Sequence, residues 1–218
     1  LPLFPDAVES FAAVIGLLAA TGMVYGAWIA VAQRDLKALV AYSSISHLGF
    51  IVIGIFAHND TGIEGSLLQM INHGIIASAL FLIVGFIEMR AGTRNLNELS
   101  GLSKAMPVLY GTFMLIMLAA LGLPGLNGFV GEFLILMGVW TSSMFAGLSG
   151  VFVLMGGLSI VLASIYMLYM FQGSMQGKPD QSSEGMTDIG RCEFKLLVPA
   201  CLLILLIGLY PKPFIDRV

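Results

Sequence analysis

Three side chains that can exchange protons, His47, His73 and Glu132, lie inside long apolar stretches of the sequence. An ionisable group at membrane depth costs roughly 2.5 to 3.5 kcal/mol on insertion scales, so it usually faces protein or water and marks an ion path. Imidazole can accept a proton on one nitrogen while it donates from the other. Burial disfavours the charged form of a carboxyl, so a buried glutamate can alternate between its two protonation states. The sequence therefore predicts a lateral proton relay.

The apolar stretches that must position these groups indicate an all-α polytopic membrane protein. Hydrophobic residues make up 58% of the chain, charged residues 11%, and the mean hydropathy is +0.94, far from the composition of soluble domains. A net charge of −3 offers no basic surface for nucleic acid. We predict six transmembrane helices, at about residues 11–32, 36–57, 63–89, 108–140, 148–171 and 194–210.

The fourth stretch is too long for one straight span, because about 33 residues at 1.5 Å each exceed a hydrocarbon core of roughly 30 Å. Proline and glycine interrupt a helix, and they gather just before Glu132, so we predict a break near residues 122–128. A plain kink is the alternative interpretation. The residues that define the break are Gly122, Pro124, Gly125 and Gly128.

The three proton-exchanging groups are predicted to share one depth. At 1.5 Å per residue, His47 lies about 15 Å from either end of its helix, His73 about 14 Å and Glu132 about 12 Å from one end of theirs. Direct contacts are not implied, so bridging waters are expected between them. Packing against a neighbouring helix is the alternative role for each group. The polar side chains expected to order the waters are Tyr42, Ser43, Ser44, Ser46, Gln69 and Asn72.

Positive charges follow the first, third and fifth helices, and the alternate connections carry none. The positive-inside rule then places both termini on the outer side of the membrane, although Lys212 and Arg217 fit this less well. We predict a polar inner-side loop at 173–193 and an outer-side tail at 211–218. The inner-side charges are Arg34, Lys37, Arg90, Arg94, Lys104, Lys178, Arg191 and Lys195.

Neither a cofactor nor a metal is expected on this chain. Cys192 and Cys201 form no CxxC pair or iron–sulfur spacing, and the sequence has no GxGxxG motif. The chain begins at Leu1 rather than at a methionine, which favours a fragment or a split gene product.

Four runs of sequence, taken in order, resemble the antiporter-like membrane subunits of respiratory complex I, a family of proton-conducting membrane transporters. That family has fourteen helices and two inverted five-helix repeats. The resemblance therefore implies that residues 1–172 form the second repeat, with a discontinuous fourth helix, and that 194–210 is the final helix. The runs are YGAW (25–28), DLKALVAYSSISHLGF (35–50), QMINHG (69–74) and GLPGLNGFVGEF (122–133).

The resemblance also implies a function. His47 and His73 match the family's central-axis histidines, and Glu132 matches its terminal proton carrier, where sister chains usually have lysine. The parent would be a proton-translocating NADH:quinone oxidoreductase of a bacterial plasma membrane or, alternatively, a mitochondrial inner membrane. NADH, FMN, iron–sulfur clusters and quinone are expected on other subunits, and antiporter-like paralogues are expected partners.

Three alternatives stay open at this point. One is a subunit of a cation/proton antiporter, which would exchange ions without a redox partner. Another is a ferredoxin- or hydrogenase-linked complex of related fold. The third is a purely structural membrane module, in which the three proton-exchanging side chains serve only packing.

Overall fold

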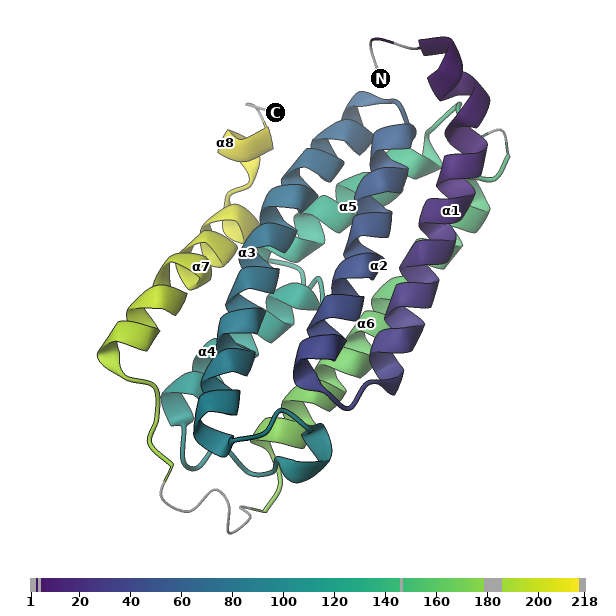
Figure 1. Ribbon diagram of the computed structural model, residues 1–218. Helices are drawn as coiled ribbons and strands as arrows, with labels where there is room; N and C mark the ends of the chain where they lie inside the picture. Colours follow the sequence, from purple (N-terminus) through teal and green to yellow (C-terminus); the bar gives the residue numbers. More distant parts are fainter. Residues whose placement is uncertain (1–2, 4, 146, 179–185, 216–218) are drawn as a thin grey trace.

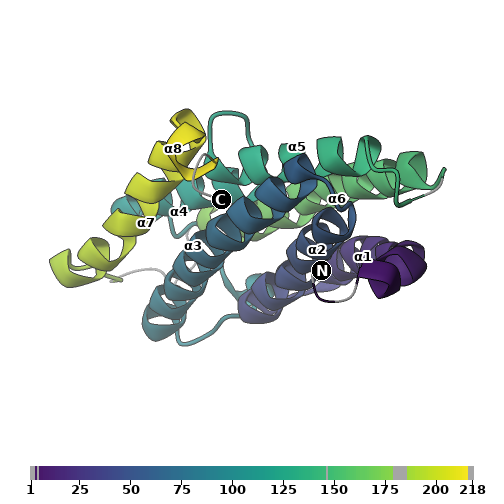
Figure 2. The ribbon, with the colours of Figure 1, turned by 90° about the horizontal axis from the view of Figure 1, so that it is seen from above.

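The computed structural model describes residues 3, 5–145, 147–178 and 186–215. Its longer helices run side by side, with α1 at one side of the bundle and α7 at the other (Figures 1 and 2). The elements in chain order are α1 (Pro5–Ala32), α2 (Leu36–Phe56), α3 (Asp60–Ala91), the 3-10 turn η1 (Leu96–Glu98), α4 (Pro107–Ala120), α5 (Asn127–Trp140), α6 (Ser149–Met175), α7 (Arg191–Leu209) and α8 (Lys212–Ile215).

Five of these helices, α1, α2, α3, α6 and α7, are long and apolar enough to cross a membrane by length and composition. The fourth predicted span is two short apolar helices, α4 and α5, separated by residues 121–126. Gly128 lies inside α5 and not in the break, which corrects the predicted range. Its small size is still needed, because a Cβ at this position would collide with the carbonyl oxygen of Ala119.

Several helix ends differ from the predicted ones for local reasons. The helix predicted from about residue 11 begins at Pro5, since proline suits the first turn of a helix. The helix predicted at 63–89 is α3, which begins earlier because the Asn59 side chain accepts a hydrogen bond from the N–H of Gly62 at 2.8 Å. It ends at Ala91, because the next residue, Gly92, has a φ of 70° that only glycine adopts readily.

The predicted inner-side loop at 173–193 is shorter than expected. Its first residues belong to α6 and its last to α7, while residues 179–185 lie outside the described part of the chain. Asp188, in the described part just before α7, is held in place, because its carboxylate accepts hydrogen bonds from the N–H groups of Val108 and Leu109 at the start of α4. In the predicted tail at 211–218, α8 occupies 212–215, and residues 216–218 lie outside the description.

Two arginine–carboxylate pairs fasten the helix ends opposite the termini. The Nε atom of Arg94 donates to Asp35, whose carboxylate also caps α2 by accepting from the N–H groups of Lys37 and Ala38. On the other side, Arg90 of α3 donates to Glu193 in the first turn of α7. These contacts fix the starts of α2 and α7 relative to α3.

Glycines let α5 lie directly against α3. A Cβ at Gly138 would be 2.5 Å from the Cα of Gly62, and a Cβ at Gly131 would overlap the Gln69 side chain. Close backbone approach of this kind is how small residues support packing between membrane helices. The helix that carries Glu132 is therefore pressed against the helix that carries His73.

Candidate functional site

Glu132 and His47 meet in the interior of the bundle. Glu132 lies on α5 and is 5% exposed, and His47 lies on α2 and is 6% exposed. The Nδ1 atom of His47 is 3.3 Å from Oε1 of Glu132, although the two atoms are not aligned as a hydrogen bond. The contact is short enough for a charged pair when the imidazole is protonated.

His73 of α3 extends this contact. Its ring centroid is 5.1 Å from that of His47, with the two planes tilted by 34°, and its side chain is only half-buried. His47 thus contacts both His73 and Glu132. The three groups predicted to share one depth come together more closely than predicted, because α2, α3 and α5 pack through glycines rather than through large side chains.

The second carboxylate oxygen of Glu132 faces the helix break. A Cβ at Gly122 would be 2.6 Å from Oε2 of Glu132, so only glycine leaves room for the carboxyl there. Gly122 also has a φ of 67°, and Gly125 a φ of 95°, which are backbone conformations that other residues rarely adopt. On its far side the break contacts α7, where a Cβ at Gly208 would collide with Leu126.

A pair of buried asparagines holds the start of α5. The Nδ2 atom of Asn72 donates to the carbonyl oxygen of Asn127 at 2.7 Å, and Nδ2 of Asn127 donates back to Oδ1 of Asn72 at 3.2 Å. Asn127 was not singled out from the sequence. Its place at the end of the break, where a new helix begins, is a signal that could have identified it.

The predicted serines bond to backbone or to each other. Ser43 and Ser44 both donate to the carbonyl oxygen of Val40. The hydroxyl of Ser46 is 2.7 Å from that of Ser159 on α6, which joins α2 to α6. Tyr42 packs against the apolar core. In the described structure none of the six predicted polar side chains, Tyr42, Ser43, Ser44, Ser46, Gln69 and Asn72, is hydrogen-bonded to His47, His73 or Glu132.

Four buried polar atoms lack a hydrogen-bond partner in the described structure, and they belong to the helices that form the site. They are Nδ1 of His47, Oε1 of Gln69, Oδ1 of Asn127 and the hydroxyl of Tyr166. Buried polar atoms nearly always have a partner, protein or ordered water. A group of such atoms is therefore the kind of place that bridging waters occupy.

Tyr166 on α6 was missed by the sequence analysis. Its side chain is completely buried. Ser159 and Tyr166 are seven residues apart and share one helix face, so the polar side chains of α6 could have indicated this face. Among the described residues no three His, Cys, Asp or Glu side chains are grouped to hold a metal ion.

Comparison with known proteins gives consistent matches over nearly the whole chain. Residues 1–162 match the family model described as NADH:quinone oxidoreductase/Mrp antiporter, TM. NADH-quinone oxidoreductase subunit M of Mycobacterium tuberculosis is 41% identical over 99% of this chain and 38% of its own length. The chain thus spans about two fifths of the length of the curated relatives it matches.

Two solved structures have the same arrangement of helices. A chain of respiratory complex I from Thermus thermophilus with bound NADH is 32% identical, with a TM-score of 0.90 over 98% of this chain and 44% of that one. A chain of the Mrp complex from Dietzia sp. has a TM-score of 0.82 over 97% of this chain and 46% of that one, at 20% identity. The second likeness concerns the fold alone.

Proposed function

Because this chain belongs to the NADH:quinone oxidoreductase/Mrp antiporter transmembrane family, we propose that it forms a proton-translocating part of subunit M of NADH:quinone oxidoreductase. The identity to subunit M of Mycobacterium tuberculosis supports this choice within the family. Electron transfer would take place on other subunits of the complex, which would hold NADH, FMN, iron–sulfur clusters and quinone. The membrane partners would include antiporter-like paralogues.

The observation that carries the proposal is the contact of His47 with both His73 and Glu132, beside the helix break. The Nδ1 atom of His47 is 3.3 Å from the carboxylate of Glu132, and its ring centroid is 5.1 Å from that of His73. An imidazole in this position takes a proton on one nitrogen and gives one up from the other. A proton would pass from His73 through His47 to Glu132, and Glu132 would release it toward the outer face.

The proposed orientation follows from the positive charges, with both termini on the outer side of a bacterial plasma membrane. Residues 1–172 would then be one five-helix repeat, with α4 and α5 as its discontinuous helix. Residues 173–193 would lie on the inner side, α7 would be the final span, and 211–218 the outer tail. The arginine–carboxylate pairs of Asp35 and Glu193 would lie at the inner surface.

The test is the substitution Glu132→Gln in the assembled complex. In inside-out membrane vesicles, proton uptake is followed with a pH-sensitive dye and divided by the rate of quinone reduction by NADH. We expect uptake per electron to fall at least about tenfold, since a positioned acid or base contributes roughly 10²- to 10⁴-fold. Glu132→Asp, which keeps the carboxyl, should retain more of the uptake than Glu132→Gln.

Two control variants remove a carboxylate and an imidazole that lie outside the site. Glu9→Gln neutralises an exposed carboxylate of the same chain, and His58→Asn replaces an exposed histidine whose φ of 52° asparagine tolerates. Both should pump normally. Normal pumping by Glu132→Gln would refute the relay, and a complex that no longer assembles would favour the purely structural role. Sodium-dependent transport without NADH would favour an antiporter.

A further inference from the structure

The helix break is touched by two different elements, α5 and α7. The backbone at Gly122 faces the carboxyl of Glu132, since a Cβ at Gly122 would be 2.6 Å from Oε2. Gly208 of α7 lies against the end of the break. A Cβ at Gly208 would be 2.5 Å from the Cα of Leu126 and would also collide with the carbonyl oxygen of Gly125. No larger residue therefore fits at position 208 unless the break moves.

The face of α7 that carries Gly208 is the one that packs on the bundle. Leu197 and Ile204 are completely buried and belong to the same apolar cluster as Phe113 and Met117 of α4. Positions 197, 204 and 208 follow the spacing of one helix face. Irregular backbone at membrane depth is tolerated only where protein or water covers it. We infer that this face of α7 covers the end of the break.

The residues that lead into α7 are attached to the start of α4. The Asp188 carboxylate accepts hydrogen bonds from the N–H of Val108 at 2.7 Å and from the N–H of Leu109 at 3.2 Å. A helix start leaves such N–H groups without partners inside the helix, and the side chain of Met106, which precedes α4, does not cap it. One segment, residues 188–208, thus contacts both the start of α4 and the break that follows α4.

We propose that this segment, called here the α7 segment, holds the helix break in place, and that Gly208 is a positioning residue that keeps the backbone at Gly122 next to the carboxyl of Glu132. The proposal rests on the relay proposed above, because it concerns the surroundings of the same carboxyl. The balance between the two protonation states of a carboxyl depends on burial and on the groups that face its oxygens. The α7 segment would thereby influence proton transfer without contributing an ionisable group to it.

The structure explains why a displacement at Leu126 should reach Gly122. The residue after Leu126 is Asn127, which is held by two hydrogen bonds to Asn72 of α3. The N–H of Leu126 also donates to the carbonyl oxygen of Leu123 at 3.0 Å, which closes this part of the break into a turn. A side chain at position 208 would therefore push on a turn that cannot give way toward α5, and the neighbouring backbone at Gly122 would shift.

The test is Gly208→Ala in the assembled complex. The control is Gly157→Ala on α6, because a Cβ at Gly157 meets nothing within 4 Å. Infrared difference spectra follow the C=O stretch of the protonated carboxyl of Glu132, which is identified as the band that Glu132→Gln abolishes. We expect Gly208→Ala to displace this band and to lower proton uptake per electron several-fold, and Gly157→Ala to change neither. If Gly208 served packing alone, less complex would assemble but the band would stay in place.

Asp188→Ala is the second variant, which decides the question if Gly208→Ala prevents assembly. It releases the start of α4 and introduces no collision, so the Glu132 band should again be displaced and uptake per electron should fall by a smaller factor. The control is Asp60→Ala, which removes an exposed carboxylate from the first turn of α3.

An unmoved Glu132 band in Gly208→Ala, or in Asp188→Ala where Gly208→Ala does not assemble, would overturn the proposal. The position of the band does not depend on pumping. It therefore separates a failure of this proposal from a failure of the relay, which normal pumping by Glu132→Gln would reveal.

Discussion

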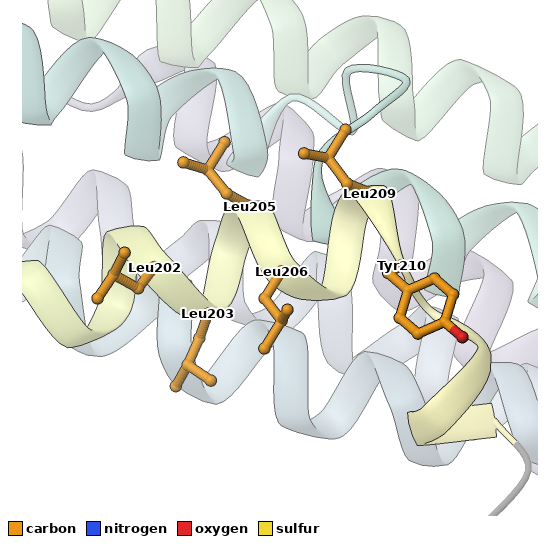
Figure 3. A pocket seen from close by; sticks show the side chains of 6 residues that line it. All are labelled: Leu202, Leu203, Leu205, Leu206, Leu209 and Tyr210. Atoms are coloured by element: carbon orange, nitrogen blue, oxygen red, sulfur yellow. The ribbon is translucent and has the colours of Figure 1, made fainter.

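The centre of the bundle and the outer face of α7 are both built from strongly apolar helices, yet they differ in what they enclose. Of an apolar stretch of 18 residues in each helix, 56% is buried in α2 and 17% is buried in α7. The centre holds His47, Glu132 and Tyr166, whereas the face of α7 presents a shallow groove of leucines (Figure 3), formed by Leu202, Leu203, Leu205, Leu206, Leu209 and Tyr210.

The two helices are similarly apolar, but only the one that neighbouring helices enclose carries a buried ionisable side chain. The position of polar side chains therefore depends on burial by other helices rather than on the mean hydropathy of the helix. A lipid-facing helix can remain uniformly apolar because acyl chains need no hydrogen bonds. An enclosed helix can carry ionisable groups because other helices and water can pair with them. The following predictions test this contrast between the centre and the α7 face.

The largest expected effect comes from the same substitution made in each region. Leu68 on α3 is completely buried, and Leu206 on α7 is 51% exposed. Leu68→Ala should lower the free energy of unfolding by about 2 to 5 kcal/mol because it leaves a cavity. Leu206→Ala should change it by less than about 0.5 kcal/mol. Denaturant titration in detergent micelles measures both, and equal losses would show that the α7 face is enclosed after all.

A smaller effect is expected at the two glycines of the break. Gly122→Ala and Gly125→Ala both place a side chain at positive φ, with a strain of about 1 to 2 kcal/mol each. A Cβ at Gly122 also meets the carboxyl of Glu132, whereas a Cβ at Gly125 meets open space. Both variants should lose similar stability, but proton uptake per electron should fall several-fold further in Gly122→Ala. Equal proton uptake per electron in the two variants would show that the contact between Gly122 and Glu132 does not matter for proton transfer.

The smallest effect concerns the carboxylates that cap α2 and α7. Burial tends to raise the pKa of Asp35, but hydrogen bonds from Ala38, Arg94 and Lys37 outweigh it and lower the pKa. The side chain of Arg90 and the N–H of Gly190 lower the pKa of Glu193. A carboxyl with a lowered folded-state pKa stabilises the fold above its unfolded pKa, and this contribution is lost as pH falls through the folded value.

Thermal unfolding between neutral pH and about pH 3 checks this, since unperturbed carboxyls titrate near pH 4. Asp35→Asn and Glu193→Gln should each reduce the acid-induced fall in the unfolding temperature. The reduction should be slight, because both groups are partly exposed and such pairs contribute little. An unchanged acid response in both variants would contradict the assignment.

The sequence was sufficient for the fold class and the family. The all-helical membrane fold and the resemblance to complex I antiporter-like subunits are confirmed. The break could be located because proline and glycine act locally through the backbone, at Gly122 and Pro124. Likewise, an ionisable residue inside an apolar run, such as Glu132, is conspicuous without any knowledge of its neighbours.

The contacts between helices could not be predicted in the same way. A helix that is apolar all round gives no sign of which face is enclosed, so the contacts of His47 with His73 and Glu132 could not be predicted. Tyr166 was missed because a tyrosine is unremarkable in a membrane helix until its hydroxyl is found unpaired. The close contact between Gly208 and Leu126 could not be predicted either, because it joins segments more than 80 residues apart in sequence.

The two-point attachment of α5 to α3 has a mechanical consequence. Asn127 binds Asn72 at one end of α5, and Gly138 crosses Gly62 at the other. We therefore expect α3 and α5 to move as one rigid unit, in which the backbone at Glu132 keeps its position relative to the backbone at His73. Any switching between protonation states must then rely on torsions of individual side chains and exchange of waters, which take picoseconds to nanoseconds, and not on slower sliding of whole helices.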